Sequence, residues 1–125
     1  MRLLICGDRN WTDEIAIGAV ICYLKPTMII EGECRGADKL ARKVAEDLGY
    51  SVESKTILSF PADWNRYGNG AGHIRNTQML KEGKPELVGA FHSDIENSRG
   101  TANMLTQAED NGISYFLIDK EVKGE

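Results

Sequence analysis

Four short apolar runs recur along this chain, and glycine and charged residues cluster shortly after each of them. The runs cover residues 3–6, 28–30, 52–57 and 87–91. Short apolar runs that alternate with helical patterns predict parallel strands joined by helices. In an open parallel sheet, ligands bind beyond the carboxyl ends of the strands. The four clusters therefore predict one pocket at a single edge of the sheet.

Amphipathic segments lie between the predicted strands. The clearest covers residues 37–48, where apolar side chains recur at helical spacing and Gly49 follows as a C-terminal cap. Thr12 predicts the start of an earlier helix, which must end near Lys25 because Pro26 disfavours helical geometry in the residue before it. Two further helices are expected over residues 72–82 and from residues 99–101 to Gly112.

A fifth strand is expected over residues 113–118, which are apolar enough to be buried on both faces of a sheet. Connections between parallel strands are right-handed, which leaves few topologies for five strands and four helices. The sequence therefore predicts a single domain, residues 1–125, of the α/β class. We expect a three-layer α/β/α, Rossmann-like, doubly wound and mainly parallel sheet of about five strands.

The charge balance narrows the classes of function. Lys and Arg number 15 against 19 Asp and Glu, which gives a formal net charge of −4. A non-specific nucleic-acid binder needs a basic face to displace counterions. The charge balance therefore argues against a single-strand nucleic-acid module, although a local basic pocket is compatible with this total.

The apolar and cysteine content points to a cytoplasmic protein. The longest apolar stretch, residues 15–24, is too short to span a bilayer, and the apolar segment at the N-terminus is too short for a signal peptide. The three cysteines form no CxxC pair, which favours reduced thiols. Cys34 lies beside Arg35, so a reactive thiol at this position is an open alternative.

Three of the clusters combine features that bind anions. Gly7 lets the backbone approach a ligand closely, and Arg9 offers a planar fork for a phosphate or carboxylate, although a solvated arginine explains Arg9 equally well. Gly32 and Gly36 free the backbone at the start of a helix, where N–H groups and the helix dipole attract anions. Residues 98–101 supply a second helix start of the same kind.

Two carboxylates stand close to these predicted anion sites. Asp38 falls in the first turn of a predicted helix, where capping and dipole compensation explain it at least as well as ligand contact does. Glu31 ends a buried strand, and a buried carboxylate is costly unless it is paired or functional. Glu31 is therefore a candidate working carboxylate.

Residues 60–76 form the densest polar and aromatic segment of the chain. Trp64 offers a flat face, Asp63 a carboxylate, and Arg75 and Asn76 a cation and an amide, a combination that suits a ribose or base beside a phosphate. A surface loop with Trp64 as a hydrophobic plug is the structural alternative. Loops of this length inside a small domain are usually functional, so we favour a binding role.

The histidines do not predict a metal site. His73 and His92 are the only two, and neither has a partner at metal-ligand spacing. No Ser–His–Asp arrangement can be read from the order of residues. We therefore expect neither a metal nor a cofactor.

These clusters together resemble the YpsA-related (YspA) branch of the SLOG superfamily, small Rossmann-like proteins related to the LOG and DprA groups. The resemblance covers nearly the whole chain, and the stretch from Ala62-Asp63-Trp64 to Arg75-Asn76 is its most specific part. The other residues that carry it are Gly7, Arg9, Trp11, Glu31, Gly32, Gly36, Ala37, Asp38, Gly68, Ala71, Gly72, Met79, Gly100 and Thr101.

The resemblance implies a Rossmann-like fold and the binding of nucleotides or nucleotide-derived signals, with some relatives acting in conflict between bacteria and mobile elements. Enzymatic relatives of the LOG type cleave the N-glycosidic bond of nucleoside monophosphates with a Pro-Gly-Gly-x-Gly-Thr motif and a following glutamate. In this chain residues 94–99 replace the Pro-Gly-Gly part, and Asn103 stands about where that glutamate is expected. An amide cannot act as a carboxylate base, so the chain departs from the catalytic pattern.

The sequence thus predicts a sensor or sequestering protein for a small nucleotide-like ligand, and it leans away from an enzyme. The alternative is a LOG-type nucleotide N-glycosidase with Glu31 or Asp63 as its carboxylate. Self-association through the apolar residues 15–24 is also expected. The candidate ligand-binding residues are Gly7, Arg9, Trp11, Gly32, Gly36, Ala37, Asp38, Asp63, Trp64, Gly72, Arg75, Asn76, Gly100 and Thr101.

Overall fold

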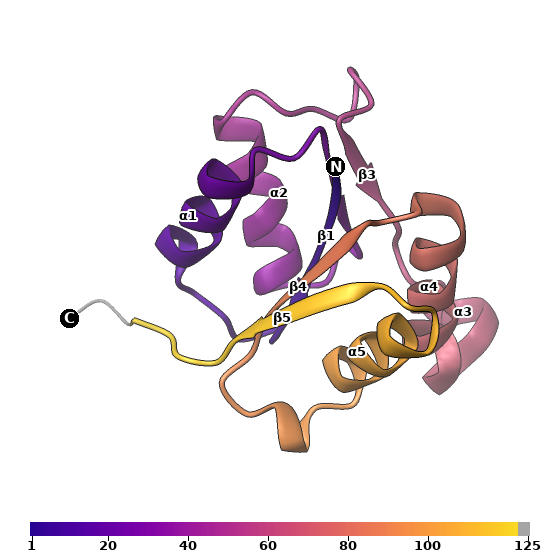
Figure 1. The fold of residues 1–125 in the computed structure, drawn as a ribbon. Coiled ribbons are helices and arrows are strands. Elements are labelled where there is room, and N and C mark those ends of the chain that lie inside the picture. The colour runs from indigo at the N-terminus through magenta and orange to yellow at the C-terminus, as the bar shows by residue number, and fades with distance from the viewer. Residues whose placement is uncertain (123–125) are drawn as a thin grey trace.

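A computed structural model describes residues 1–122 and contains one sheet of five parallel strands. The strands are β1 (Arg2–Gly7), β2 (Met28–Glu31), β3 (Ile57–Ser59), β4 (Leu87–Phe91) and β5 (Ser114–Ile118), in the spatial order β3-β2-β1-β4-β5 (Figure 1). After β3 the chain crosses to the other side of β1, so the strand order reverses between β1 and β4. The predicted doubly wound α/β fold is confirmed.

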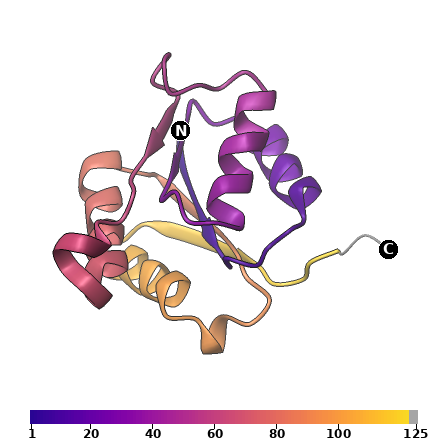
Figure 2. The ribbon, with the colours of Figure 1, turned by 180° about the vertical axis from the view of Figure 1, so that it is seen from behind.

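Helices cover both faces of the sheet (Figures 1 and 2). Helices α1 (Glu14–Leu24) and α2 (Ala37–Asp47) lie on one face. The short α3 (Trp64–Tyr67), α4 (Ala71–Gln78) and α5 (Gly100–Asp110) lie on the other. A π-helical turn, Met79–Gly83, continues α4, and 3₁₀ turns cover Gly68–Gly70 and Ile95–Asn97.

The alternation of side chains along β1 divides the core into two parts. Leu3 and Ile5 pack with α1 and α2, whereas Leu4 and Cys6 pack with α5 and with Met79 beyond the end of α4. This alternation follows from the two-residue period of a strand. Both faces of β1 are fully apolar, as expected for the central strand of a parallel sheet.

Two predictions about strands were wrong. Residues 52–55 form a turn and not a strand, because hydrogen bonds among Ser51, Ser54 and Thr56 close it and Lys55 takes a left-handed conformation. β5 is not buried on both faces, because it lies at the edge of the sheet with Ser114 and Tyr115 exposed.

Two predictions about helices need correction. The N-cap of α1 is Asp13 and not Thr12, since the Asp13 carboxylate accepts a hydrogen bond from the Ala16 N–H at 3.1 Å. Residues 60–76 are not one long loop, because α3, a 3₁₀ turn and the start of α4 occupy most of them. The predicted end of α1 near Lys25 and the extent of α2 are confirmed.

The C-terminal segment is tied to the start of α1. The Glu121 side chain accepts hydrogen bonds from the N–H and hydroxyl of Thr12 and from the N–H of Asp13. In return, the Asp13 carboxylate accepts one from the Val122 N–H at 3.1 Å. Four contacts thus hold the segment after β5 against the loop that follows β1.

Helix α1 also presents apolar side chains away from the core. Ile17 and Ile21 are buried, whereas Ile15 and Tyr23 are 84% and 86% exposed. Within residues 1–122, no helix combines the length and apolar character that crossing a membrane requires.

The loops after β1 and β2 are joined through one backbone carbonyl. The Asp8 oxygen accepts hydrogen bonds from the Trp11 and Ala37 N–H groups, both at 3.1 Å. Gly36 makes this approach feasible, because its φ is +80° and a Cβ there would collide with the Asp8 and Arg9 carbonyls. Only glycine fits this position without strain.

We therefore expect Gly36→Ala to lower the free energy of unfolding by roughly 2–4 kcal/mol, through backbone strain and overpacking. The matched control is Gly100→Ala, since nothing lies within 4 Å of a Cβ at Gly100 and its backbone is helical. Urea denaturation measures both. Equal stability of the two variants would contradict this account of Gly36.

Candidate functional site

A polar cleft of about 1150 Å³ opens at the carboxyl ends of β1 and β4. Its walls come from the loops after β1, β2 and β4, from α3 and α4, and from the N-terminus of α5. This is the place where the strand order reverses, and doubly wound sheets bind their ligands at that point. The glycine- and charge-rich clusters that follow the strands in the sequence therefore do lie together, at the carboxyl ends of the strands.

The structure brings nine of the fourteen candidate ligand-binding residues to this cleft. They are Gly7, Arg9, Asp38, Trp64, Gly72, Arg75, Asn76, Gly100 and Thr101. They come from four separate segments of the chain, so no single stretch of sequence makes the cleft.

The other five candidates do not line the cleft. Trp11 is 1% exposed and packs edge-on against Phe91, with ring centroids 5.6 Å apart. Ala37 is buried, and Gly36 belongs to the loop junction described above. Asp63 is exposed and caps α3 by accepting the Arg66 N–H at 3.1 Å. Gly32 lies behind a cleft residue, Arg75.

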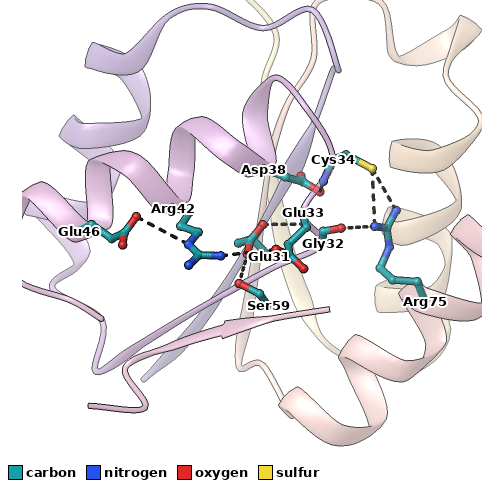
Figure 3. Close-up of polar contacts among 9 residues, drawn as sticks. All are labelled: Glu31, Gly32, Glu33, Cys34, Asp38, Arg42, Glu46, Ser59 and Arg75. Atoms are coloured by element: carbon teal, nitrogen blue, oxygen red, sulfur yellow. Dashed lines mark hydrogen bonds and ion pairs between the residues drawn. The ribbon is translucent and has the colours of Figure 1, made fainter. Parts of the chain in front are cut away.

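Arg75 is a buried cation that connects α4 with the loop after β2 (Figure 3). Its guanidinium donates to the Gly32 carbonyl, to Asn76 Oδ1 at 3.1 Å and to the Cys34 sulfur at 3.6 and 3.7 Å. A Cβ at position 32 would overlap the guanidinium, which explains this glycine. Arg75 thus joins α4 to the loop after β2 at the floor of the cleft. Little of its side chain is exposed to a ligand.

An amide network extends from Arg75 to α5. Asn76 Nδ2 donates to the Gly100 carbonyl and to Asn103 Oδ1, each at 3.1 Å. Gln107 Nε2 donates to the same Asn103 oxygen at 2.7 Å. Asn103 therefore joins α4 to α5 and does not line the cleft.

The Asp38 carboxylate occupies the backbone nest after β2. It accepts the Cys34 N–H at 3.2 Å and interacts with the Gly32 N–H, close to the Arg75 guanidinium (Figure 3). Burial raises the pKa of Asp38 to about 7, against the opposing charge of Arg75. Glu31 raises this pKa further, and the two backbone N–H groups lower it. The Asp38 carboxyl group thus occupies the site where the sequence predicted a ligand anion.

The N-terminus of α5 forms the opposite wall. Ser98 Oγ accepts the Thr101 N–H at 3.1 Å and the Ala102 N–H at 3.4 Å. Arg99 and Gly100 are exposed at this helix start, and Arg99 lines the cleft. The positive end of the helix dipole and a free guanidinium therefore meet here.

Glu31 does not line the cleft, although the sequence singled it out. It is 0% exposed, and its carboxylate accepts the Glu33 N–H at 2.6 Å and the Ser59 hydroxyl. Burial raises its pKa, while these two hydrogen bonds lower it. The buried carboxylate joins β2 to β3, which gives it a structural role.

Arginine dominates the cations of the cleft. Four of the seven arginines line it, Arg9, Arg35, Arg75 and Arg99, and none of the seven lysines in residues 1–122 does. Four carboxylates line it as well, Asp8, Glu33, Asp38 and Asp94, so the cleft is mixed in charge. Within residues 1–122, no ion pair engages Arg9, Arg35 or Arg99.

The sequence reasoning did not select Arg35 or Arg99. Both stand inside the clusters that it identified, one directly after Cys34 and the other directly before Gly100. Their position beyond the ends of β2 and β4 is the signal that could have found them. Among residues 1–122, no group of three or more His, Cys, Asp or Glu side chains is arranged to hold a metal ion.

The fold and the cleft together define a small three-layer α/β protein with an arginine-rich cleft at its topological switch point. No family model matches the chain. The chain is 29% identical over 117 residues to the Gene 61 protein of Mycobacterium phage D29, an alignment that covers 90% of this chain and 91% of the phage protein. The similarity therefore runs along almost the whole domain.

The raised pKa of Asp38 predicts a pH dependence of stability. The folded chain keeps this proton up to about pH 7, whereas the unfolded chain loses it near its ordinary value of 3.8. Stability must therefore fall as the pH rises between these values. Between pH 5 and pH 8, the wild type should lose about 2–3 kcal/mol relative to Asp38→Asn.

Urea unfolding at several pH values measures this difference. The matched control is Asp63→Asn, which removes an exposed carboxylate that caps α3. If Asp63→Asn changes the pH slope as much as Asp38→Asn does, the assignment to Asp38 is wrong.

Proposed function

We propose that this protein binds a nucleotide or a nucleotide-derived small molecule in the cleft. The observation that carries the proposal is an exposed tryptophan, Trp64, on the same cleft as three arginines without an ion pair in residues 1–122. Indole faces stack on bases, and guanidinium forks bind phosphates in a bidentate way. Few other small ligands carry both a flat ring for stacking and phosphates for the guanidinium groups.

The phosphate end of the ligand is best accommodated at α5. Arg99 is exposed there beside the helix N-terminus, and both features favour anions. The nest after β2 is a poorer phosphate site, because the Asp38 carboxylate already accepts its Cys34 N–H. Asp38 suits a ribose hydroxyl or a base N–H group instead, because its carboxyl group accepts hydrogen bonds from such donors and, above its pKa of about 7, can only accept.

The biological role that we propose is that of a sensor or sequestering protein in phage–host or defence signalling. The resemblance to the YpsA-related SLOG branch supports this role, and so does the similarity to a mycobacteriophage protein. We also propose that the protein self-associates through α1, whose exposed Ile15 and Tyr23 offer an apolar contact face.

The two tryptophans allow a direct test of the binding proposal. Trp64 is 53% exposed in the cleft and Trp11 is 1% exposed in the core, and the chain has no other tryptophan. Titration with AMP, ADP and ADP-ribose should quench the fluorescence of the wild type but not that of Trp64→Phe. In calorimetry, Trp64→Ala and Arg99→Ala should each weaken binding about tenfold or more.

Arg66→Ala is the matched control, because Arg66 is an exposed arginine next to the site that does not line the cleft. It should bind as the wild type does. The absence of heat and of quenching with every nucleotide would overturn the proposal.

A second candidate function is hydrolysis of an N-glycosidic bond. The observation that favours it is Asp38, a buried carboxyl on the cleft with a pKa raised to about 7 by burial, because a general acid works best with a pKa near the operating pH. Glu31 and Asp63, the carboxylates expected from the sequence, do not line the cleft.

Chromatography of nucleoside monophosphates after incubation with the protein tests the second candidate. Release of free base that falls at least about 100-fold in Asp38→Asn would support it, since general acids contribute at least that much. Release that is equal in the wild type and in Asp38→Asn, or no release at all, would eliminate it.

A further inference from the structure

A second hollow, of about 530 Å³, lies beside the cleft over the N-terminal half of α2. Arg9, Asn10 and Arg35 line both the hollow and the cleft, so the two are adjacent at these side chains. A ligand that fills the cleft and extends past Arg9 and Arg35 would reach the hollow. Nothing in the proposed function accounts for this extension.

The hollow has a charge pattern different from that of the cleft. Arg9, Arg35, Lys39 and Lys43 line it, and among residues 1–122 no Asp or Glu does. Lys43 forms an ion pair with Glu14 at 2.6 Å, but no ion pair in residues 1–122 engages the other three. In a chain with a net charge of −4, these three cations around one hollow concentrate positive potential at that place.

The lining of the hollow suits a group that is larger than a bare phosphate. Lys39 and Lys43 are one helical turn apart, so both face the same side of α2. Leu40 contributes an apolar floor between them and the shared arginines, and Trp11, which is 1% exposed, borders this floor from the core. An apolar floor under a cationic rim suits a flat ring that carries a phosphate.

We infer that the ligand is at least a dinucleotide, with one nucleotide in the cleft and a second phosphate-bearing unit in the hollow. This inference rests on the proposed function and names its substrate class. The linking phosphates would pass between Arg9 and Arg35, where the two cavities adjoin. A mononucleotide in the cleft would reach neither Lys39 nor Lys43.

The experiment compares the binding of AMP, of the 3′–5′-linked dinucleotide pApA and of the 5′–5′-linked diadenosine diphosphate, by calorimetry on the full chain. The wild type should bind one of the dinucleotides about tenfold or more tightly than AMP, because each charged hydrogen bond to the second unit is worth that much. The better of the two identifies the linkage.

Lys39→Ala/Lys43→Ala should remove most of this advantage and leave the affinity for AMP unchanged. The control is Lys81→Ala/Lys120→Ala, which removes the same charge from two exposed lysines that line neither cavity. Lys39→Ala alone keeps the Lys43–Glu14 ion pair, so it reports on the hollow without disturbing the contact of α2 with α1.

Three results would overturn the inference. The first is equal affinity of the wild type for AMP and both dinucleotides, and the second is equal weakening by the two double variants. The third is a loss of AMP affinity in Lys39→Ala/Lys43→Ala as large as the loss for the dinucleotide. Binding of AMP without a dinucleotide advantage would leave the proposed function standing, whereas no binding of any probe would overturn both.

Discussion

The cleft depends on the backbone of one residue, Asp8. Its N–H donates to the Phe91 carbonyl at the end of β4, at 2.9 Å. Its carbonyl accepts from Ala37 at the start of α2 and from Trp11 in its own loop. These hydrogen bonds fix the relative positions of the loops after β1 and β2 and the end of β4. The side chains on those loops, Arg9 and Arg35 among them, therefore project from a backbone that these hydrogen bonds hold in place.

A second constraint is the carboxylate that the protein places inside its own cleft. Asp38 takes up the backbone N–H donors after β2 that would otherwise attract a phosphate. Its burial costs free energy, as its raised pKa reflects, and Arg75 offsets part of that cost. The cleft is thereby made asymmetric, because the Asp38 acceptor lies on the β2 side and Arg99 lies with a helix N-terminus on the α5 side. Such asymmetry favours one orientation of any ligand that carries donors at one end and phosphates at the other.

The sequence predicted the fold well where the pattern reflects burial. The apolar stripe on α2 and the runs of β1 and β4 correspond to core residues, so periodicity located them. Periodicity failed at residues 52–55. Val52 is a residue typical of strands, but hydrogen bonds of the Ser51, Ser54 and Thr56 hydroxyl groups close a turn there.

The candidate site was predicted less completely, because a motif does not say which way a side chain points. Trp11 and Trp64 both stand in polar clusters, yet one is in the core and the other on the cleft. Asp63 was chosen for its neighbours, but its carboxylate caps α3. Glu31 was chosen because burial of a charge is costly. The hydrogen bonds that offset this cost come from the Glu33 N–H and from Ser59, a residue far along the chain. Only the three-dimensional arrangement distinguishes these cases.

The contact of Glu121 with the start of α1 has a practical consequence for work on this protein. Glu121 holds Thr12 and Asp13, which follow the loop that carries Arg9. Recombinant versions that stop before residue 121 would lose these contacts at the far end of the loop, while the hydrogen bonds of Asp8 would still hold its near end.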